Sequence, residues 1–546
     1  MNAQATCEPV VNDAVSGSRF VPHALLVVVL LLTCAARIHL RNIPLERDEG
    51  EYAYAGQLML QGIPPYKLTY NMKLPGTYAA YAAILAVFGQ TSAGIHLGLM
   101  LVNLSTIVVV FLLALRLFGS LAAIVAATSY AMLSISPSVL GFAGHATHFV
   151  VLPALLGILL LLKAIGENRL TFLFWSGTLL GLAFVMKQPG FLFVIFAGLY
   201  LIMTQREQRI HLLALMRKLV IFSAGALLPF AITCVFLWRA GVFSTFWFWT
   251  VSYASQYATN TGFREAVSLF SGVFPAIVAE SLGIWLFFLV GFTAIFWHRE
   301  ARSHSSFLLG FLLFSVLAVC PDLLFRKHYF ILLLPAISLF TGIAVSASAD
   351  LLGRSIKHQT LGHLPATLFI VVLAGSVYTQ RDFLFSTDFT SLSRSIYGGN
   401  PFPEAVEISN YLRAHTKEDT TIAILGSEPE IYFYTHRHSA TGYIYTYGLM
   451  EEQKYALQMQ NQMISEIESS RPEAIVFVNV GASWLPTDHS QTLIYSWARQ
   501  YLHDHYRLDG VVEIHNTHSE FRWGDDTNAY QPHSNSVVYV FGRKTG

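Results

Sequence analysis

The stretch "PHALLVVVLLLTCAARIHLRNIPLERDEGE", residues 22–51, joins an apolar run to a cluster of charges. A helix needs about 20 apolar residues to cross the hydrocarbon core of a bilayer, and the run approaches that length. We interpret it as an uncleaved signal anchor, because a polar segment precedes it and many more apolar segments follow it. The charges therefore stand where the chain leaves its first expected membrane span.

The composition of the whole chain is typical of a membrane protein. Of its 546 residues, 54% are hydrophobic and only 12% are charged, whereas an average soluble domain has about 25% charged residues. The net charge of +1 and the lack of a long basic run give no indication of a nucleic-acid partner. The four cysteines form no CxxC pair, so they predict neither a disulfide framework nor a metal site. We therefore expect a polytopic α-helical membrane protein.

Hydropathy predicts about eleven transmembrane helices. They are expected near residues 21–38, 94–116, 119–137, 147–163, 171–186, 189–204, 219–239, 281–297, 305–320, 328–346 and 364–380. Lysine and arginine gather in short connectors such as "TQREQR" (204–209), which favours a cytoplasmic N-terminus. An odd number of spans then places the end of the chain on the outer face.

The last third of the chain has the pattern of a soluble domain. The segments 421–425, 474–480 and 537–544 have the composition of strands, and 400–415 and 450–470 have the spacing of amphipathic helices. This order indicates an α/β domain. We therefore predict three parts, which are a cytoplasmic N-terminal tail over 1–20, a transmembrane domain over 21–380 with its first outer loop over 39–93, and an outward-facing α/β domain over 395–546.

The charge cluster after the first span has the composition of a site at the bilayer surface. Arg47, Asp48 and Glu49 lead into "EYAYAGQLMLQG" (51–62), whose spacing predicts an amphipathic helix lying flat on the membrane. Lys73 follows beside a Pro-Gly turn. A lysine can bind phosphate while a carboxylate serves as general base, so the loop would suit a lipid-linked anion. A plain solvated loop is the alternative.

This loop resembles the first outer loop of the C-type (GT-C) glycosyltransferases, membrane enzymes that use polyprenyl-phosphate sugars. The similarity is to the branch of protein mannosyltransferases, aminoarabinose transferases and galacturonosyltransferases. Its members carry an Asp-Glu motif after the first span and a Lys-Pro motif later, matched here by RDE (47–49) and KLPG (73–76). The resemblance implies that Asp48 is the catalytic base, with Glu49 beside it, and that Lys73 binds the lipid phosphate.

Two further segments place histidine or lysine at expected outer ends of spans. "GFAGHATHFVVLP" (141–153) holds His145 and His148 where many relatives have an acidic residue. These histidines could orient an acceptor hydroxyl or meet phosphate, or they could be plain interfacial residues. A zinc site needs three or four ligands, and no third ligand is evident nearby. "VMKQPGF" (185–191) contains Lys187, either a second cation for the phosphate or a snorkelling side chain.

A third basic segment is "PDLLFRKHYF" (321–330). Relatives often have an Arg-Tyr pair here, but Lys327 and His328 separate Arg326 from Tyr329 in this chain. A guanidinium pairs bidentately with phosphate oxygens, so Arg326 is the candidate phosphate clamp. A basic flank without a binding role is the alternative.

Two segments outside the motifs have open roles. The aromatic stretch 243–263 would form an interfacial belt or a lid over a sugar. The turn at Gly426, Ser427 and Glu428 follows an expected strand and could recognise an acceptor or be purely structural. It has no GxGxxG and no phosphate-loop motif, so it predicts no nucleotide site.

The resemblance implies a hexosyl or pentosyl transferase in the cytoplasmic (inner) membrane. It would move sugar from a polyprenyl-phosphate carrier to a hydroxyl of an envelope lipid, glycan or protein on the outer face. Arg47, His145, His148 and Tyr329 would contact donor or acceptor. Beyond these partners and membrane lipids no cofactor is expected, although a divalent metal stays open.

Two other functions would also suit a membrane protein with many spans. A transporter or flippase for lipid-linked saccharides would show charged or broken segments at matching midplane positions of two related halves, and the sequence shows no such repeat. An envelope polysaccharide polymerase or ligase would place its catalytic loop later in the chain.

Overall fold

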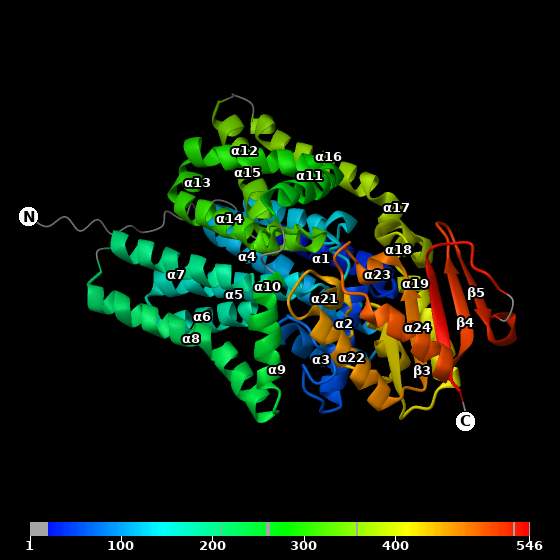
Figure 1. Cartoon of the computed structure of the whole chain (residues 1–546). Coiled ribbons are helices and arrows are strands. Elements are labelled where there is room, and N and C mark those ends of the chain that lie inside the picture. Colours follow the sequence, from blue (N-terminus) through cyan, green and yellow to red (C-terminus); the bar gives the residue numbers. More distant parts are fainter. Residues whose placement is uncertain (1–19, 209, 258–261, 356–358, 528–529, 545–546) are drawn as a thin grey trace, which may run out of the picture.

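The computed structural model describes residues 20–208, 210–257, 262–355, 359–527 and 530–544. A large helical part is joined to a domain built on a six-stranded sheet (Figure 1). The polytopic helical architecture with a C-terminal α/β domain is thereby confirmed. The predicted N-terminal tail lies, apart from its last residue, outside the described residues.

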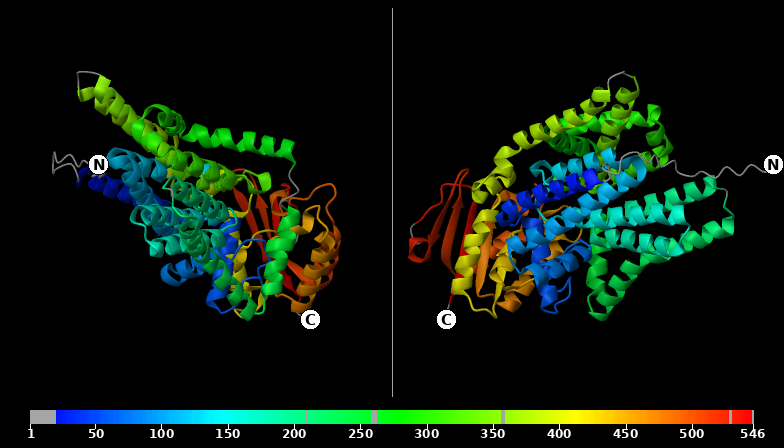
Figure 2. Two further views of the ribbon diagram at one scale, coloured as in Figure 1. Left: turned by 90° about the vertical axis from the view of Figure 1, so that its left-hand side faces the viewer. Right: turned by 180° about the vertical axis from the view of Figure 1, so that it is seen from behind.

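The helical part is built from the long helices of the chain. They are α1 (Phe20–His39), α4 (Ser92–Leu133), α5 (Ala146–Glu167), α6 (Leu170–Met186), α7 (Gly190–Glu207), α8 (Leu212–Arg239), α11 (Phe263–Glu280), α12 (Leu282–Trp297), α14 (Ser305–Val319), α15 (Leu334–Ser355) and α16 (Leu364–Thr379). Seen from three sides, they form elongated arms pointing away from the sheet (Figures 1 and 2).

The predicted number of about eleven spans is too high by the criteria of length and composition. Among the described residues, seven helices are long and apolar enough to cross a membrane, or eight if the bent pair α11–α12 is one span. The expected spans 94–116 and 119–137 both lie in α4, where the backbone of Gly119 (φ 78°, ψ −174°) is not helical and separates two helical parts. The predicted break between these two spans is therefore present, although α4 is counted once among the seven helices. The helices α6 and α14 have only 17 and 15 residues.

The loop between the first two long helices folds into two helices, α2 (Arg47–Leu60) and α3 (Gly76–Phe88). The expectation that the helix after the charge cluster lies flat on the membrane is wrong. Residues 49–58 of α2 are all buried. Helix α3 packs on one side of α2, and α20 (Glu430–Thr435) of the C-terminal domain packs against it as well. The polar face that the sequence assigned to water is therefore covered by protein.

The C-terminal domain is a mixed sheet flanked by helices. Its strands, in chain order, are β1 (Thr421–Leu425), β2 (His438–Ser439), β3 (Ala474–Asn479), β4 (Tyr506–Ile514), β5 (Ser519–Trp523) and β6 (Val537–Arg543). Their spatial order is β2-β1-β3-β6-β4-β5, in which β1 pairs parallel with β2 and β3, and the remaining pairs are antiparallel. The main helices are α18 (Phe389–Tyr397), α19 (Phe402–His415), α22 (Ala456–Ser470) and α24 (Leu493–His505). The sequence anticipated β1, β3 and β6 but missed β2, β4 and β5.

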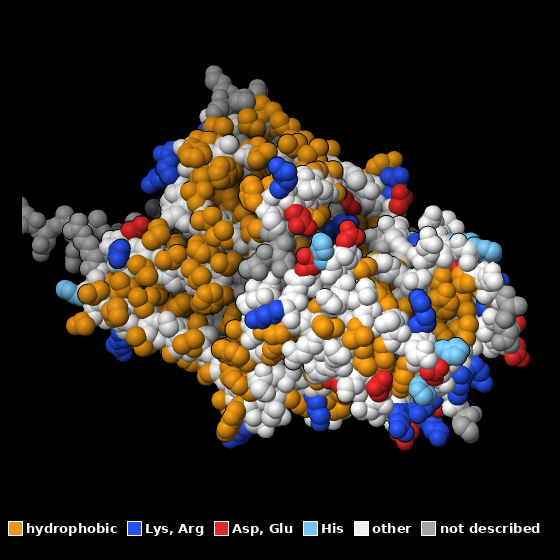
Figure 3. All heavy atoms as spheres, viewed as in Figure 1, with side chains coloured by type: hydrophobic (Ala, Val, Ile, Leu, Met, Phe, Trp, Pro, Cys, Tyr) orange, Lys and Arg blue, Asp and Glu red, His pale blue; other side chains and the backbone are white. Residues whose placement is uncertain are grey.

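The two parts share one hydrophobic core at their junction. A single cluster of buried side chains joins Tyr52 and Tyr54 of α2 to Ile424 of β1 and Val476 of β3. On the outside they differ, since hydrophobic side chains cover the helical arms whereas charged ones gather over the sheet domain (Figure 3). The junction is thus positioned where the apolar and polar surfaces of the molecule meet.

Candidate active site at the start of α2

A capping box fixes where α2 begins. The Glu46 carboxylate accepts a hydrogen bond from the backbone N–H of Glu49 at 2.9 Å, and the Glu49 carboxylate accepts one from the backbone of Glu46. Acidic residues in the first turn are favoured because the helix dipole is positive there. Arg47 and Asp48 are therefore held in that first turn, where their backbone direction is set by the cap.

Asp48 lies at the centre of a group of charges from distant segments. Lys73 Nζ donates to Asp48 Oδ1 at 2.7 Å and to Glu51 Oε2 at 2.6 Å. The Tyr445 hydroxyl, from the C-terminal domain, also donates to Asp48 Oδ1, at 2.8 Å. Glu51 is further fixed by Asn71 at 2.9 Å and by the Tyr78 hydroxyl. Asp48 Oδ2 makes none of these hydrogen bonds.

These partners keep Asp48 ionised. Burial alone would raise the pKa of Asp48, but Lys73, followed by His145 and His328, outweighs burial and holds that pKa well below its ordinary range. Burial likewise opposes the charge on Lys73, yet Asp48 and Glu51 raise the pKa of its ammonium well above the usual value. The site therefore contains a carboxylate and an ammonium, both charged.

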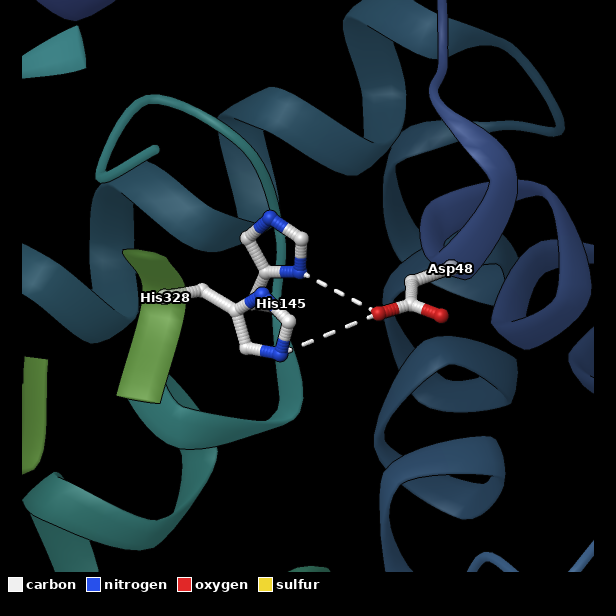
Figure 4. Close-up of side chains that lie close together, drawn as sticks. All are labelled: Asp48, His145 and His328. Carbon is white, nitrogen blue, oxygen red and sulfur yellow. Dashed lines mark ion pairs between the residues drawn. The ribbon is translucent and has the colours of Figure 1, made fainter. Parts of the chain in front are cut away.

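Two histidines face the free oxygen of Asp48. His145 Nδ1 lies 3.6 Å and His328 Nε2 3.9 Å from Asp48 Oδ2, and the two imidazole rings stack with centroids 4.1 Å apart (Figure 4). The three ligand atoms of this group lie within 4.8 Å of one another. Neither ring nitrogen of His145 has a hydrogen-bond partner among the described residues. Two imidazoles and a carboxylate suit a divalent cation such as zinc, so the third ligand that the sequence did not reveal is supplied by His328.

Lys187 stands on another side of the site. Its Nζ lies 4.1 Å from the centre of the Tyr329 ring, and the Tyr329 ring packs edge-on against His328. Within the described residues it makes no ion pair, and burial lowers the pKa of Lys187 to about 8. Arg326 is exposed at the start of the same 3₁₀ segment and acts electrostatically on both Lys187 and His328. The predicted phosphate cations Lys187 and Arg326 are thus near each other.

Three predicted site residues point elsewhere. Glu49 is only 1% exposed and bonds to His96 Nε2 at 3.0 Å and to the backbone N–H of Gly144 at 2.6 Å. Arg47 is held by the C-terminal domain through Glu428 at 3.0 Å. His148 is buried within α5 and is not part of the group around Asp48. These residues build the frame of the site.

Sequence reasoning assigned no role to three participants, which are Glu51, His328 and Tyr445, and it named Glu428 without anticipating its ion pair with Arg47. Glu51 and His328 stood inside motifs already singled out, and the run of carboxylates at 46, 49 and 51 was the available signal for Glu51. Tyr445 is 397 residues from Asp48, and no local pattern marks it. In the turn at Ser427 and Glu428, the Ser427 carbonyl and the Glu428 carboxylate both accept hydrogen bonds from the guanidinium of Arg47.

An apolar cavity is lined in part by the segment that carries His328. It has a volume of about 500 Å³ and is lined only by apolar side chains, with Phe270, Phe274 and Trp285 on one side. Phe325 and Phe330, which bracket the segment of Arg326 and His328, belong to the same lining. The segment 325–330 thus contributes side chains both to the group around Asp48 and to this apolar cavity.

Comparison with known proteins identifies the class of this molecule. Residues 73–238 match the family model described as dolichyl-phosphate-mannose-protein mannosyltransferase. The chain is a membrane glycosyltransferase that is similar to this family over about a third of its length. Enzymes of this class take their sugar from a lipid-phosphate donor, as the resemblance of the first loop implied. No curated protein sequence matches the chain.

Solved structures share the fold of this glycosyltransferase. ArnT from Cupriavidus metallidurans bound to undecaprenyl phosphate overlaps with a TM-score of 0.55 at 15% identity, over 85% of this chain and 94% of ArnT. The oligosaccharyltransferase AglB from Archaeoglobus fulgidus, in complex with an inhibitory peptide and a dolichol-phosphate, overlaps with a TM-score of 0.52 at 12% identity. That overlap covers 93% of this chain and 74% of AglB. At such low identity the likeness concerns the fold.

Proposed function

We propose that this glycosyltransferase moves a sugar from a polyprenyl-phosphate carrier to a hydroxyl group of an envelope acceptor, with Asp48 as general base. The acceptor would be a lipid, a glycan or a protein on the outer face of the cytoplasmic membrane. The observation that carries the proposal is that one short segment, 325–330, places His328 beside Asp48 and also lines an apolar cavity of about 500 Å³ through Phe325 and Phe330. A donor with a charged head and a long apolar tail needs both.

The cavity and the cations suggest how the donor is placed. The polyprenyl chain would occupy the cavity lined by Phe325 and Phe330. Its phosphate would then lie at the Arg326–Tyr329 segment, where Arg326 and Lys187 supply positive charge. Lys73 uses two of its three N–H donors on Asp48 and Glu51, which leaves one for a phosphate oxygen. The sugar would project toward Asp48.

The reaction would be a displacement at the anomeric carbon. The acceptor oxygen forms the new bond to that carbon, while the bond from the carbon to the phosphate oxygen breaks and its electron pair leaves with the polyprenyl phosphate. The acceptor proton passes to Asp48 Oδ2, because Oδ1 is engaged by Lys73 and Tyr445. A carboxylate of low pKa is a weak base, but it can take the proton late, when the new bond has made the hydroxyl acidic.

The surrounding residues have supporting roles in this scheme. Fixed cations stabilise the charge that develops on the leaving phosphate. A divalent cation held by Asp48, His145 and His328 would bind the same Asp48 oxygen that takes the proton, so it would be an alternative to that role and not an addition to it. The ring of Tyr329 positions the ammonium of Lys187 through a cation–π contact. Glu49 and Arg47 position the first turn of α2 without touching substrate.

The test uses the purified full-length protein in nanodiscs with polyprenyl-phosphate sugars. Release of free polyprenyl phosphate is measured for the native chain and for Asp48→Asn. Removal of a general base costs about 10²- to 10⁴-fold in rate, so the variant should retain little turnover. The control is Asp382→Asn, since Asp382 is exposed and far along the chain after α16; this variant should match the native rate.

Two results would count against the proposal. Unchanged turnover in Asp48→Asn would remove the base assignment. Movement of the intact donor lipid across the bilayer, without loss of its sugar, would instead support a transporter.

A further inference from the structure

The hairpin of β4 and β5 carries a second group of possible metal ligands, remote from Asp48. Figure 1 shows these two strands at the edge of the sheet, on the side of the molecule away from the helical arms. The sequence at the turn is "EIHNTHSE", residues 513–520. It places two histidines and two glutamates on either side of a two-residue turn.

The register of the hairpin brings these four side chains to one face. Glu513 pairs directly with Glu520 across the two strands. His515 donates its backbone N–H to the carbonyl of His518 at 2.9 Å, so the two histidines close the turn opposite each other. Alternate residues of a strand point to the same side, and directly opposed residues are neighbours. The two imidazole rings accordingly stack with centroids 4.7 Å apart.

Neighbouring groups leave one ligand atom free on each of three side chains. Arg522 pairs with Glu520 Oε2 at 2.9 Å, which leaves Oε1 toward the histidines. Thr517 bonds to His518 Nδ1 at 3.3 Å, which leaves Nε2 free. The Nε2 atoms of His515 and His518 each lie 3.9 Å from Glu520 Oε1. For Glu520 and His518, such support of the atom that would face away from a metal is typical of metal sites.

Glu513 is a buried carboxylate that lies next to this group and is held in place by hydrogen bonds. Its carboxylate is fully buried and accepts hydrogen bonds from the backbone of His533 at 2.8 Å, from the backbone of Ser534, and from the Tyr530 hydroxyl. Its Oε1 also lies 3.7 Å from His515 Nε2. The Glu513 carboxylate therefore orients the ring of His515. The side chains of His518 and Glu520 remain accessible to solvent.

We propose that His515, His518 and Glu520 bind a divalent transition-metal cation, for which zinc is the best fit. The three ligand atoms lie within 4.8 Å of one another. Tetrahedral zinc bonds of about 2.0–2.2 Å require ligand atoms about 3.4 Å apart, so the ligands would have to move closer together by about 1 Å. The solvent-facing side chains of His518 and Glu520 are able to make this shift. Water would complete the shell. The cation would fasten the turn of the edge hairpin, and this role is independent of sugar transfer.

The test measures zinc bound to the full-length protein in detergent by equilibrium dialysis, after removal of metal with a chelator. The native chain should bind one equivalent more than His518→Ala or Glu520→Gln. His503→Ala is the matched control, because His503 is an exposed histidine of the same domain with one acidic neighbour; it should bind as the native chain does. His145→Ala separates the two groups, since it should leave the hairpin equivalent intact.

Cobalt gives a second readout, because tetrahedral ligation by two imidazoles changes its visible absorption. Equal zinc binding by the native chain and His518→Ala would overturn the proposal. So would an equal loss of zinc in His503→Ala, which would mean that surface histidines bind the metal without a defined site.

Discussion

Arg47 and Asp48 are neighbours in the first turn of α2, yet the ion pairs that they form differ in their exposure. In the pair of Arg47 with Glu428 the side chains are 12% and 0% exposed. In the pair of Lys73 with Asp48 they are 23% and 21% exposed. The first pair is closed and joins α2 to the C-terminal domain. The second is open on one side, where a substrate can reach it.

The comparison shows that one short charged segment has two different roles. Arg47 fixes α2 to the C-terminal domain, and Asp48 forms an ion pair that stays partly exposed. The closed pair is reinforced by Asn400 and by the rings of Phe402 and Tyr447, which pack on the guanidinium of Arg47. All of these come from the C-terminal domain. The open pair is therefore as accurately positioned as the domain contact beside it, and breaking the closed pair should affect stability first.

The largest expected effect follows from Arg47→Met. It would leave Glu428 buried without its cation, next to Glu430, whose pKa burial and Glu428 already raise. Loss of one partner of a buried pair costs about 3–5 kcal/mol of unfolding free energy. Thermal unfolding in detergent measures it. Arg381→Met is the control, because its partner Asp382 is exposed, and a similar loss of stability in that variant would contradict the distinction.

A smaller loss is expected for Gly50→Ala, at the contact between α2 and α20. A β-carbon at Gly50 would lie 2.5 Å from the backbone nitrogen of Glu430, so one helix must move. Overpacking of this kind costs about 1–3 kcal/mol. Both melting temperature and turnover should fall together. Gly272→Ala, where a β-carbon meets nothing within 4 Å, should not lower either, and equal behaviour of the two variants would mean that the contact is loose.

Donor binding at the open pair should depend on pH, because the neighbouring Lys187 loses its charge as the pH rises. Because the pKa of Lys187 is lowered to about 8 by burial, its ammonium is present below pH 8 and is lost above it. Donor binding should weaken about tenfold as pH rises through this value, seen as a rise in KM of the lipid donor. Lys187→Arg keeps its charge throughout and should remove that rise. A KM profile identical in both proteins would exclude a role for Lys187.

The smallest effect is expected for Tyr445→Phe. This change deletes one hydrogen bond to Asp48 but keeps the ring. A hydrogen bond to a charged group contributes about 1.5–3 kcal/mol at most, and Lys73 still holds Asp48, so kcat/KM should fall about tenfold or less. In Tyr447→Phe the lost hydroxyl bonds to the carbonyl of Ala482 instead. Turnover of this control should be near native, and a larger loss there than in Tyr445→Phe would contradict the assignment.

The site could be predicted from the sequence only where its contacts are local. The RDE and Lys-Pro motifs pointed to Asp48 and Lys73, and these two side chains do meet. They lie 25 residues apart, on the two sides of one loop. His145 and Lys187 were also found, because each stands at the end of an apolar helix, where a polar residue is conspicuous.

Other parts of the site depend on long-range packing. No local sequence pattern around Tyr445 or Glu428 indicates that these side chains contact α2, which lies almost 400 residues earlier in the chain. The position of α2 itself was wrong for the same reason. An apolar face on a helix next to a membrane indicates lipid, and only the folded C-terminal domain shows that protein covers the opposite face.

The sequence by itself determined that this is a membrane protein of many helices and that acidic residues begin the helix after its first span. Hydrophobic length and helix capping are local properties, and they were sufficient for both conclusions. The tertiary structure alone showed why Asp48, which the resemblance had already singled out, is the carboxylate that stays accessible. Asp48, Glu49 and Glu51 have nearly the same chemistry, but each residue turns a helix by about 100°. Packing against both domains therefore buries Glu49 and Glu51 and leaves Asp48 open.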